Sequence, residues 1–160
     1  MRVVDEVEKG EVKMEEQKWT TEAGLIAIAN HYGTHRCGYV GVPLGHPLHC
    51  VGYSERADCL SAVDVKNAPL GKRGIITLFS VALSDCVTSP MAAFDVHGGI
   101  TFAGKLKQFA GDDWFFGFDC NHADDSLEAC TLSYVVSECE MLASQIVALV
   151  PLRANMEAAK

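Results

Sequence analysis

The chain has 160 residues, 49% of them hydrophobic and 21% charged, which fits one folded domain and excludes an intrinsically disordered protein. Its 21 acidic and 13 basic residues give a formal net charge of −8, so nonspecific binding to nucleic acid or to an anionic membrane is not expected. The cysteines form no CxxC pair, no secretory signal precedes them and no apolar run approaches the length of a membrane span, which predicts reduced thiols in a soluble cytoplasmic protein.

The chain opens with an acidic, lysine-containing segment and continues into an expected helix. Residues 1–18 carry isolated valines among charges, a pattern that fits a solvated strand, a frayed helix or a mobile arm. We treat them as an acidic N-terminal arm before a domain that spans 19–150. The stretch "TTEAGLIAIANHYG" predicts a short helix over residues 21–32, because its threonines can cap the first turn, its apolar residues recur at helical spacing and Gly33 can end it.

A strand and an irregular region are expected next. "HRCGYVGVPLGHPLHC" predicts a strand that begins near Cys37 and ends at Pro43, since proline has no amide hydrogen for a sheet. A loop rich in glycine, proline and histidine follows up to Gly52. The polar segment from there to Gly74 predicts a surface excursion with a short helix near 57–63.

Three further strands are expected in the second half of the chain. "GIITLFSVAL" is short, apolar and rich in β-branched residues. "FDVHGGITFAG" reads as another strand, interrupted by Gly98 and Gly99, where a bulge or a close backbone approach is expected. "DWFFGFD", with its large aromatic residues, predicts the third strand.

The last expected element is a long amphipathic helix. Over residues 132–150, "LSYVVSECEMLASQIVALV" places apolar side chains on one stripe, and Met141 and Leu142 belong to the predicted core. Pro151 ends the helix, and residues 151–160 form a C-terminal tail. Strands between an early and a late helix predict an α+β fold, an antiparallel or mixed sheet with the C-terminal helix packed on one face.

Two polar clusters are the strongest candidates for a functional site. In the first, "DVHGG", Asp95 and His97 would point to the same face of a strand. A carboxylate beside an imidazole can orient the ring, raise its basicity or share a metal ion with it. A hydrogen-bonded strand end followed by a bulge is the structural alternative.

The second cluster, "GFDCNHADD", follows directly on the aromatic strand. Asp119, His122 and Asp124 offer oxygen and nitrogen donors that suit a divalent metal ion or a general acid and base, whereas Asp125 can instead cap a following turn. An Asx-rich turn is the structural alternative. We expect Asp119 and His122 to face His97 across neighbouring strands.

Neighbouring residues complete the expected site. Trp114 and Phe116 could form the floor of a pocket, and Cys120 is expected to pack in the core, since no second close thiol pair completes a structural zinc site. In "THRCGYVGVPLGHPLHC", Arg36 is a candidate anion clamp and His46 lies in a loop bounded by glycine and proline. A solvated histidine without a role is the structural alternative for His46.

The segment "DVHG" resembles the Asp-x-His motif that opens calcineurin-like metallophosphoesterases. The later Asn-His-Glu and Gly-His-x-His motifs of that family do not occur in the chain. The resemblance therefore covers one short segment and leaves metal-assisted phosphoester hydrolysis as a reaction class to test.

Four segments taken together, "HRCGYVGVPLGHPL", "VHGGITFAG", "WFFGFDCNHADD" and "LSYVVSECEMLASQI", resemble a family of small uncharacterised proteins of bacteriophages and prophages. The similarity runs from about residue 19 to residue 149. It implies a cytoplasmic phage protein that acts inside an infected bacterium. The family has a glycine near the position of Asp124, so the resemblance leaves open whether Asp124 or Asp125 is the functional aspartate. The matching polar positions are Arg36, His46, His97, Asp119, His122 and Asp124.

The clusters and the resemblance support three hypotheses for function. The first is a protein that binds a small nucleotide-derived ligand and sequesters a host immune signal. The second is a metal-dependent phosphodiesterase or other hydrolase that uses His97, Asp119 and His122 as metal ligands or proton-transfer groups. The third is a protein-binding inhibitor of a host factor that acts through the acidic surface. The candidate ligand-binding residues are Arg36, His46, His97, Trp114, Phe116, Asp119, His122 and Asp124.

Overall fold

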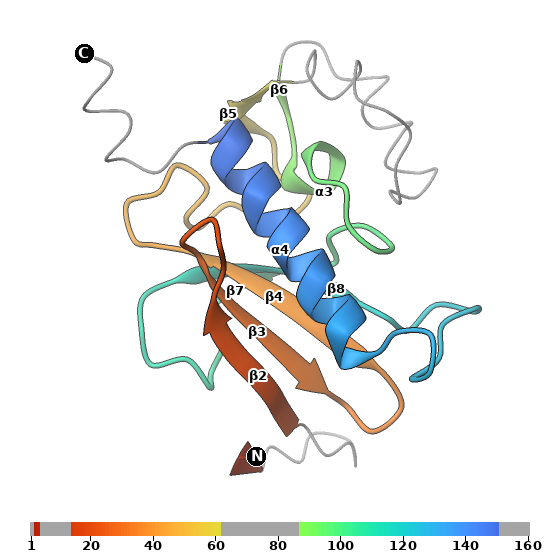
Figure 1. The fold of residues 1–160 in the computed structure, drawn as a ribbon. Helices are drawn as coiled ribbons and strands as arrows, with labels where there is room; N and C mark the ends of the chain where they lie inside the picture. The colour runs from red at the N-terminus through yellow and green to blue at the C-terminus, as the bar shows by residue number, and fades with distance from the viewer. Residues whose placement is uncertain (1, 4–13, 62–86, 151–160) are drawn as a thin grey trace.

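A computed structural model describes residues 2–3, 14–61 and 87–150. Within these ranges the chain is an α+β domain built on one large antiparallel sheet (Figure 1). The sheet has six strands in the order β1-β2-β3-β4-β8-β7. Their bounds are Arg2–Val3 for β1, Met14–Thr20 for β2, Ile26–His31 for β3, Arg36–Val42 for β4, Phe102–Gly104 for β7 and Trp114–Asp119 for β8.

A single long helix covers one face of the described sheet. This helix, α4 (Leu132–Leu149), packs on β3 and β4 (Figure 1). The other described elements are short: β5 (Ala57–Ser61) pairs with β6 (Val87–Thr88), and α3 (Pro90–Ala93) packs on β5. The expected α+β fold, with the C-terminal helix on one face of a sheet, is confirmed.

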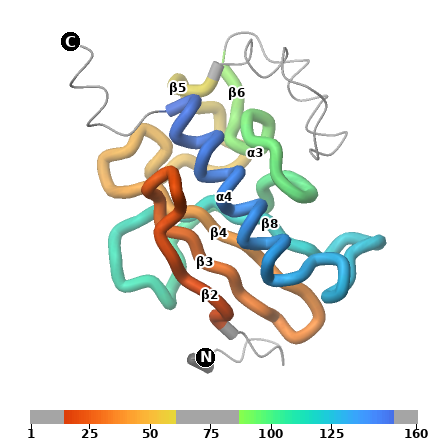
Figure 2. Tube along the Cα trace, viewed as in Figure 1, coloured from red at the N-terminus to blue at the C-terminus, as the bar shows by residue number. Residues whose placement is uncertain are grey.

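Strands β4 and β8 are far apart in the sequence but are neighbours in the sheet (Figure 2). Their antiparallel register places Gly38 opposite Phe118. A Cβ atom at Gly38 would lie 2.5 Å from Cζ of Phe118 and 2.7 Å from Sγ of Cys139, so the missing side chain allows α4 to approach the sheet closely. A larger residue there would push α4 away from β4.

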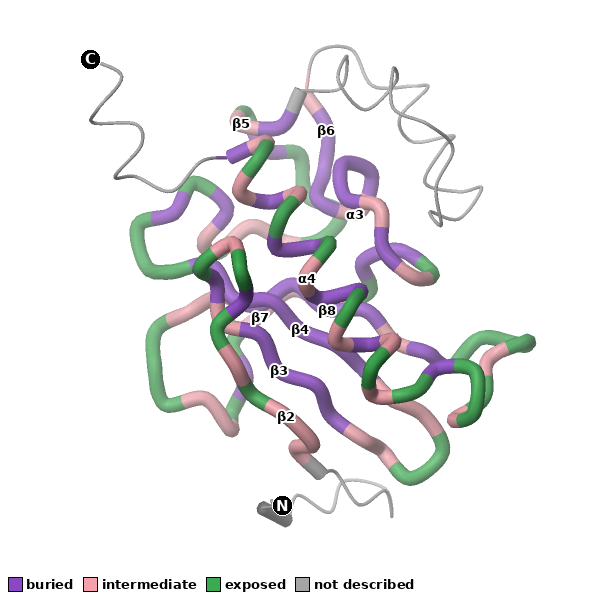
Figure 3. The backbone as a smooth tube through the Cα atoms, in the orientation of Figure 1, coloured by how far each residue is buried: buried purple, intermediate pink, exposed green. Residues whose placement is uncertain are grey.

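Alternation along the strands divides the core into two layers. On the α4 side, Phe116 and Phe118 pack with Leu142 of the helix in the larger cluster. On the opposite side, Tyr39 and Phe115 belong to a smaller cluster. Because successive strand residues point to opposite faces, the middle of β8 is buried on both sides (Figure 3).

The helix α4 follows its predicted pattern closely. The Thr131 side chain accepts a hydrogen bond from the amide of Tyr134 and so caps the first turn. Val135 and Leu142 lie in the buried stripe, but Met141, also predicted in the core, is 42% exposed because adjacent helical residues point about 100° apart. Contrary to the sequence expectation, α4 is long and apolar enough to cross a membrane by length and composition; its buried stripe packs on β3 and β4 as in a core helix.

The helix predicted over residues 21–32 is wrong. Thr21 closes a tight turn in which its amide and its hydroxyl both donate to the carbonyl of Leu25, at 2.8 and 2.9 Å, and β3 follows. Ile28 faces the smaller core cluster and Ala27 faces the larger one, which is the alternation of a strand. Pairing with β2 on one side and β4 on the other outweighs the weak local helical preference.

Two further secondary-structure predictions are wrong. The short helix expected near 57–63 is replaced, over its described part, by β5. The single strand expected in "FDVHGGITFAG" is reduced to β7, and residues 94–101 form a loop. Gly98 and Gly99 have φ angles of +67° and +84°, so they make a turn in the left-handed region and not a bulge within a strand.

The strands predicted in "HRCGYVGV" and "DWFFGFD" and the helix predicted over 132–150 are confirmed as β4, β8 and α4. The predicted strand "GIITLFSVAL" and the tail 151–160 lie outside the described residues. Within the expected acidic arm 1–18, β1 pairs with the first residues of β2, and β2 pairs with β3. The described part of the arm is therefore part of the sheet.

Candidate functional site

Two loops and α4 bring a pair of histidines and a carboxylate together. His97 comes from the loop after α3, and His122 and Asp125 come from the connection between β8 and α4. The rings of His97 and His122 lie edge to face, with centroids 5.4 Å apart. They are close, as predicted, but both lie in loops and not on neighbouring strands as expected. The ring of Tyr134 lies next to that of His97, with centroids 5.5 Å apart. We call His97, His122, Asp125 and Tyr134 the His–Asp cluster.

The carboxylate of Asp125 hydrogen-bonds to both histidines of this cluster. Its Oδ2 lies 2.9 Å from Nε2 of His97, 2.7 Å from Nδ1 of His122 and 2.9 Å from the backbone nitrogen of His122. Its Oδ1 accepts a weaker hydrogen bond from Sγ of Cys130 at 3.7 Å. The Asp125 side chain is only 11% exposed, so protein groups largely replace water around this carboxylate.

When both rings are neutral, the hydrogen bonds determine which nitrogen of each ring carries the proton. An ionised carboxylate only accepts hydrogen bonds, so Nε2 of His97 and Nδ1 of His122 both donate to Asp125. Nδ1 of His97 is then an acceptor, and the Tyr134 hydroxyl donates to it over 2.8 Å. Nε2 of His122 keeps its lone pair, on a side chain that is 43% exposed.

Burial and hydrogen bonding shift the pKa values of the side chains in this cluster in opposite directions. Burial tends to raise the pKa of Asp125, but the hydrogen bonds from His97 and His122 outweigh it and hold that pKa well below its usual range. Burial, with a contribution from the nearby Glu138 carboxyl, raises the pKa of Tyr134 to about 12. Burial also raises the pKa of Cys130. Asp125 is therefore ionised near neutral pH, while the hydroxyl and the thiol keep their protons.

Side chains of α4 hold the loop that carries His97. Besides the contact with Tyr134, the Glu138 carboxyl accepts a hydrogen bond from the backbone amide of His97 at 2.8 Å. Gln145 makes two hydrogen bonds of 2.7 Å with the backbone of Asp95. These three α4 residues are separated by about one and two helical turns, so they lie along one side of the helix.

Sequence reasoning missed Tyr134 and Glu138, and it left Asp125 open between a cap and the functional aspartate. The available signal was Glu138, which directly precedes Cys139 of the apolar stripe and is 1% exposed. A carboxyl group is rarely buried without hydrogen-bonding partners. A glutamate at a buried helical position therefore indicates that another segment must dock there with free amide groups.

Gly98 allows His122 to reach this position. A Cβ atom at Gly98 would overlap the His122 ring, and its φ of +67° is unfavourable for other residues. The glycine expected to permit a close approach does so, with His122 as the group that approaches.

The two aspartates favoured by the sequence lie elsewhere. Asp119 shares the strand face of Phe115, so it points away from α4, and its carboxylate accepts hydrogen bonds from the Thr101 hydroxyl at 2.9 Å and from the Asn121 amide at 3.2 Å. The expectation that Asp119 faces His97 is thus not met, because side chains alternate along β8. Asp124 is exposed, and its neighbour Asp125 makes the contacts with both histidines.

Arg36 is engaged in holding the loop, which differs from the expected free anion clamp. Its Nε lies 2.9 Å from Oε2 of Glu16 in an ion pair. Its Nη1 donates to the carbonyls of Leu127 and Cys130 at 3.1 and 3.0 Å. The guanidinium thereby fixes the connection that carries His122 and Asp125 against β4.

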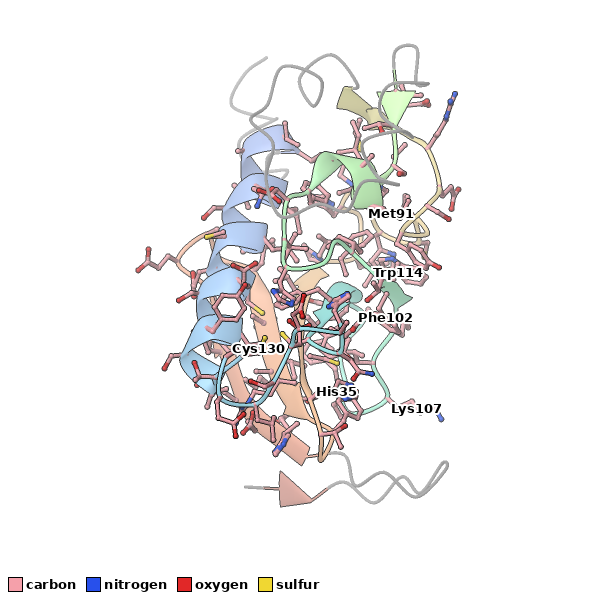
Figure 4. All side chains as sticks on the ribbon, turned by 90° about the vertical axis from the view of Figure 1, so that its right-hand side faces the viewer. His35, Met91, Phe102, Lys107, Trp114 and Cys130 are labelled. Carbon is pink, nitrogen blue, oxygen red and sulfur yellow. The ribbon has the colours of Figure 1, made fainter. Side chains whose placement is uncertain are left out.

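The other predicted site residues serve the core. His46 is buried, with Nδ1 accepting from the Leu48 amide at 3.1 Å and Nε2 lying 3.2 Å from the Val150 carbonyl. Phe116 is fully buried and cannot line an open pocket. Trp114 starts β8, donates its indole N–H to the carbonyl of Val51 at 2.9 Å and lies well away from Cys130 (Figure 4).

Among the residues that the structure describes, two overlapping sets of side chains could hold a metal ion. The ligand atoms of His97, His122 and Asp125 all lie within 4.8 Å of one another, and so do those of His97, Cys120 and Cys130. Cys120 is buried in the larger core cluster, as expected for a packing residue. The first set reaches the surface through His122, whereas both thiols of the second set are buried.

Comparison of the chain with protein-family models found no match. Comparisons with curated proteins and with solved structures found none either.

Proposed function

We propose that the chain binds a small nucleotide-derived ligand at the His–Asp cluster and sequesters it. The observation that carries this proposal is the state of His122. Its Nδ1 is held by Asp125 at 2.7 Å, yet its side chain is 43% exposed. A ring that is fixed on one side and open on the other is oriented in advance to hydrogen-bond a ligand, which lowers the entropy cost of binding.

The ligand class and the setting come from the resemblance to small phage and prophage proteins. A cytoplasmic phage protein of this size can oppose host defence by removing a nucleotide-derived immune signal. Ribose hydroxyls and phosphate oxygens suit the open Nε2 of His122, which can accept or donate a hydrogen bond according to its protonation.

Calorimetry tests this proposal directly. The full chain is titrated with a panel of cyclic nucleotides and ADP-ribose derivatives, and we expect heat of binding with at least one of them. Replacement of His122 by Ala should weaken that binding at least tenfold, since a pre-oriented hydrogen bond is lost (about 1.4 kcal/mol or more). Asp124→Asn is the matched control, because Asp124 is an exposed neighbour of Asp125. No heat with any member of the panel would contradict the proposal.

Hydrolysis of the same ligand is the second candidate, and the proton assignment favours it. Asp125 accepts Nδ1–H of His122, which leaves Nε2 able to take a proton from water. The water oxygen would then bond to phosphorus as the P–O ester bond breaks, and the leaving oxygen would take a proton from solvent. Intact ligand recovered after denaturation indicates sequestration. Cleaved product that disappears in Asp125→Asn indicates catalysis.

A further inference from the structure

The charges around the His–Asp cluster favour a cation. Asp125 accepts a hydrogen bond from the His97 ring and Glu138 accepts one from the His97 backbone amide, so two carboxyl groups lie beside this histidine. The guanidinium of Arg36 is already bound by Glu16 and by two carbonyl groups. A phosphate group placed here would meet carboxylates, so a bound cation would remove an electrostatic cost.

We propose that His97, His122 and Asp125 bind a divalent transition-metal ion of the zinc class. The candidate donor atoms are Nε2 of His97, Nδ1 of His122 and Oδ2 of Asp125, and the last lies 2.9 and 2.7 Å from the other two. Bonds of about 2.0–2.2 Å in a tetrahedral site separate neighbouring donors by about 3.4 Å. To admit the ion, Oδ2 of Asp125 would have to lie about 0.5 Å farther from Nε2 of His97 and about 0.7 Å farther from Nδ1 of His122.

The surrounding groups suit such an ion. A metal-binding histidine usually donates its second ring N–H to a fixed partner, and the Tyr134 hydroxyl, 2.8 Å from Nδ1 of His97, can accept that hydrogen bond. With the ion bound, the proton of a neutral His97 ring would lie on Nδ1 and that of a neutral His122 ring on the exposed Nε2. Nε2 of His122 would then donate a hydrogen bond to a ligand and would not act as the base in hydrolysis. Cys130 and the His122 amide keep the Asp125 carboxylate in place.

The set of His97, His122 and Asp125 fits a metal ion that binds a ligand better than the set of His97, Cys120 and Cys130 does. Three protein ligands and one open position are typical of zinc sites that bind a substrate, and His122 places this set at the surface. Cys120 and Cys130 are 2% and 3% exposed, which would enclose an ion in the core. The open position would receive a phosphate or hydroxyl oxygen, and in this respect the inference rests on the proposed function.

The test is calorimetric titration of the metal-free, reduced full chain with Zn²⁺ alone. A Cys50→Ser background removes a competing surface pair, since Sγ of the exposed Cys50 lies 3.1 Å from Nδ1 of His49. We expect one zinc ion per chain, affinity at least tenfold weaker in His122→Ala and in Asp125→Asn, and unchanged affinity in Asp124→Asn. His122→Ala keeps the test valid if Asp125→Asn fails to fold, because the His122 side chain is 43% exposed whereas that of Asp125 is 11% exposed.

Cobalt spectroscopy identifies the ligands. Co²⁺ bound to two imidazoles and a carboxylate should lack the intense near-ultraviolet charge-transfer band that thiolate ligands produce. No zinc binding, unchanged affinity in His122→Ala, or a thiolate band with Co²⁺ would each overturn the proposal. The nucleotide panel is also run with EDTA: ligand binding without zinc binding contradicts the metal site alone, and zinc binding without any ligand contradicts only the proposed function.

Discussion

Two histidines contact opposite ends of the α4 region, and their partners differ in kind. At the C-terminal end, His46 is buried and bonded on both nitrogens to backbone groups, the Leu48 amide and the Val150 carbonyl. In the N-terminal half, His97 is bonded to the side chains of Tyr134 and Asp125. The same residue type therefore ties loops to α4 in one place and joins a network of ionisable groups in the other.

The kind of hydrogen-bonding partner indicates whether a buried histidine contributes to stability or to binding. Backbone partners cannot exchange protons or move to admit a ligand without disturbing the fold, so His46 is expected to contribute to stability. The partners of His97 can change hydrogen-bond direction, and they lead to the exposed His122 ring. The His–Asp cluster is therefore expected to contribute to binding more than to stability.

The largest expected effect on stability comes from His46→Ala. It removes a buried side chain and leaves the Leu48 amide and the Val150 carbonyl without this partner, which should cost about 2–4 kcal/mol of unfolding free energy. Denaturant unfolding measures the loss, and zinc and ligand affinity should be unchanged.

His97→Ala is the counterpart in the His–Asp cluster. It should abolish binding but cost less unfolding free energy than His46→Ala, because the His97 side chain is 18% exposed. If His46→Ala lost binding and His97→Ala lost more stability, the roles assigned to the two histidines would be wrong.

Gly98→Ala should have the next largest effect, mainly a loss of zinc and ligand binding. The new Cβ atom would displace the His122 ring, and the left-handed φ of +67° adds about 1–2 kcal/mol of strain. Gly33→Ala is a close control, because Gly33 has a φ of +70° and a Cβ atom there meets nothing within 4 Å. Both proteins should lose similar stability, but only Gly98→Ala should lose zinc and ligand affinity. Equal affinities in the two variants would show that the contact with His122 has no role.

The smallest expected effect is a pH dependence due to His46. Burial lowers the pKa of His46 below its usual range, so below about pH 6.5 the unfolded chain takes up a proton that the folded chain does not. This contribution to stability is complete above about pH 6.5 and is lost as the pH falls toward the folded pKa, by at most about 1.4 kcal/mol per pH unit. Unfolding free energies between about pH 7.5 and 5.5 should fall more steeply in the wild type than in His46→Gln. Equal slopes would contradict the buried, neutral His46.

The local sequence pattern was sufficient to predict those elements that are a strand or a helix whatever they pack against. "DWFFGFD" and the stripe of α4 were predicted correctly because aromatic strand residues and a long helical period leave one interpretation. "GLIAIAN" was misread as part of a helix, since a short apolar run fits both periods. Its pairing with β2 and β4, which are separate segments of the chain, decided for a strand.

The sequence by itself determined that the chain forms an α+β domain and that the segments with His97 and His122 hold the candidate site. Only the tertiary structure decided that Asp125, and not Asp119, lies between the two rings. Alternation along β8 sends Asp119 to the face opposite α4, and the turn after the strand brings Asp125 back toward His97. Likewise, Arg36 acquires its role from Glu16 and from the loop carbonyls of Leu127 and Cys130, contacts between segments far apart in the chain that no local pattern encodes.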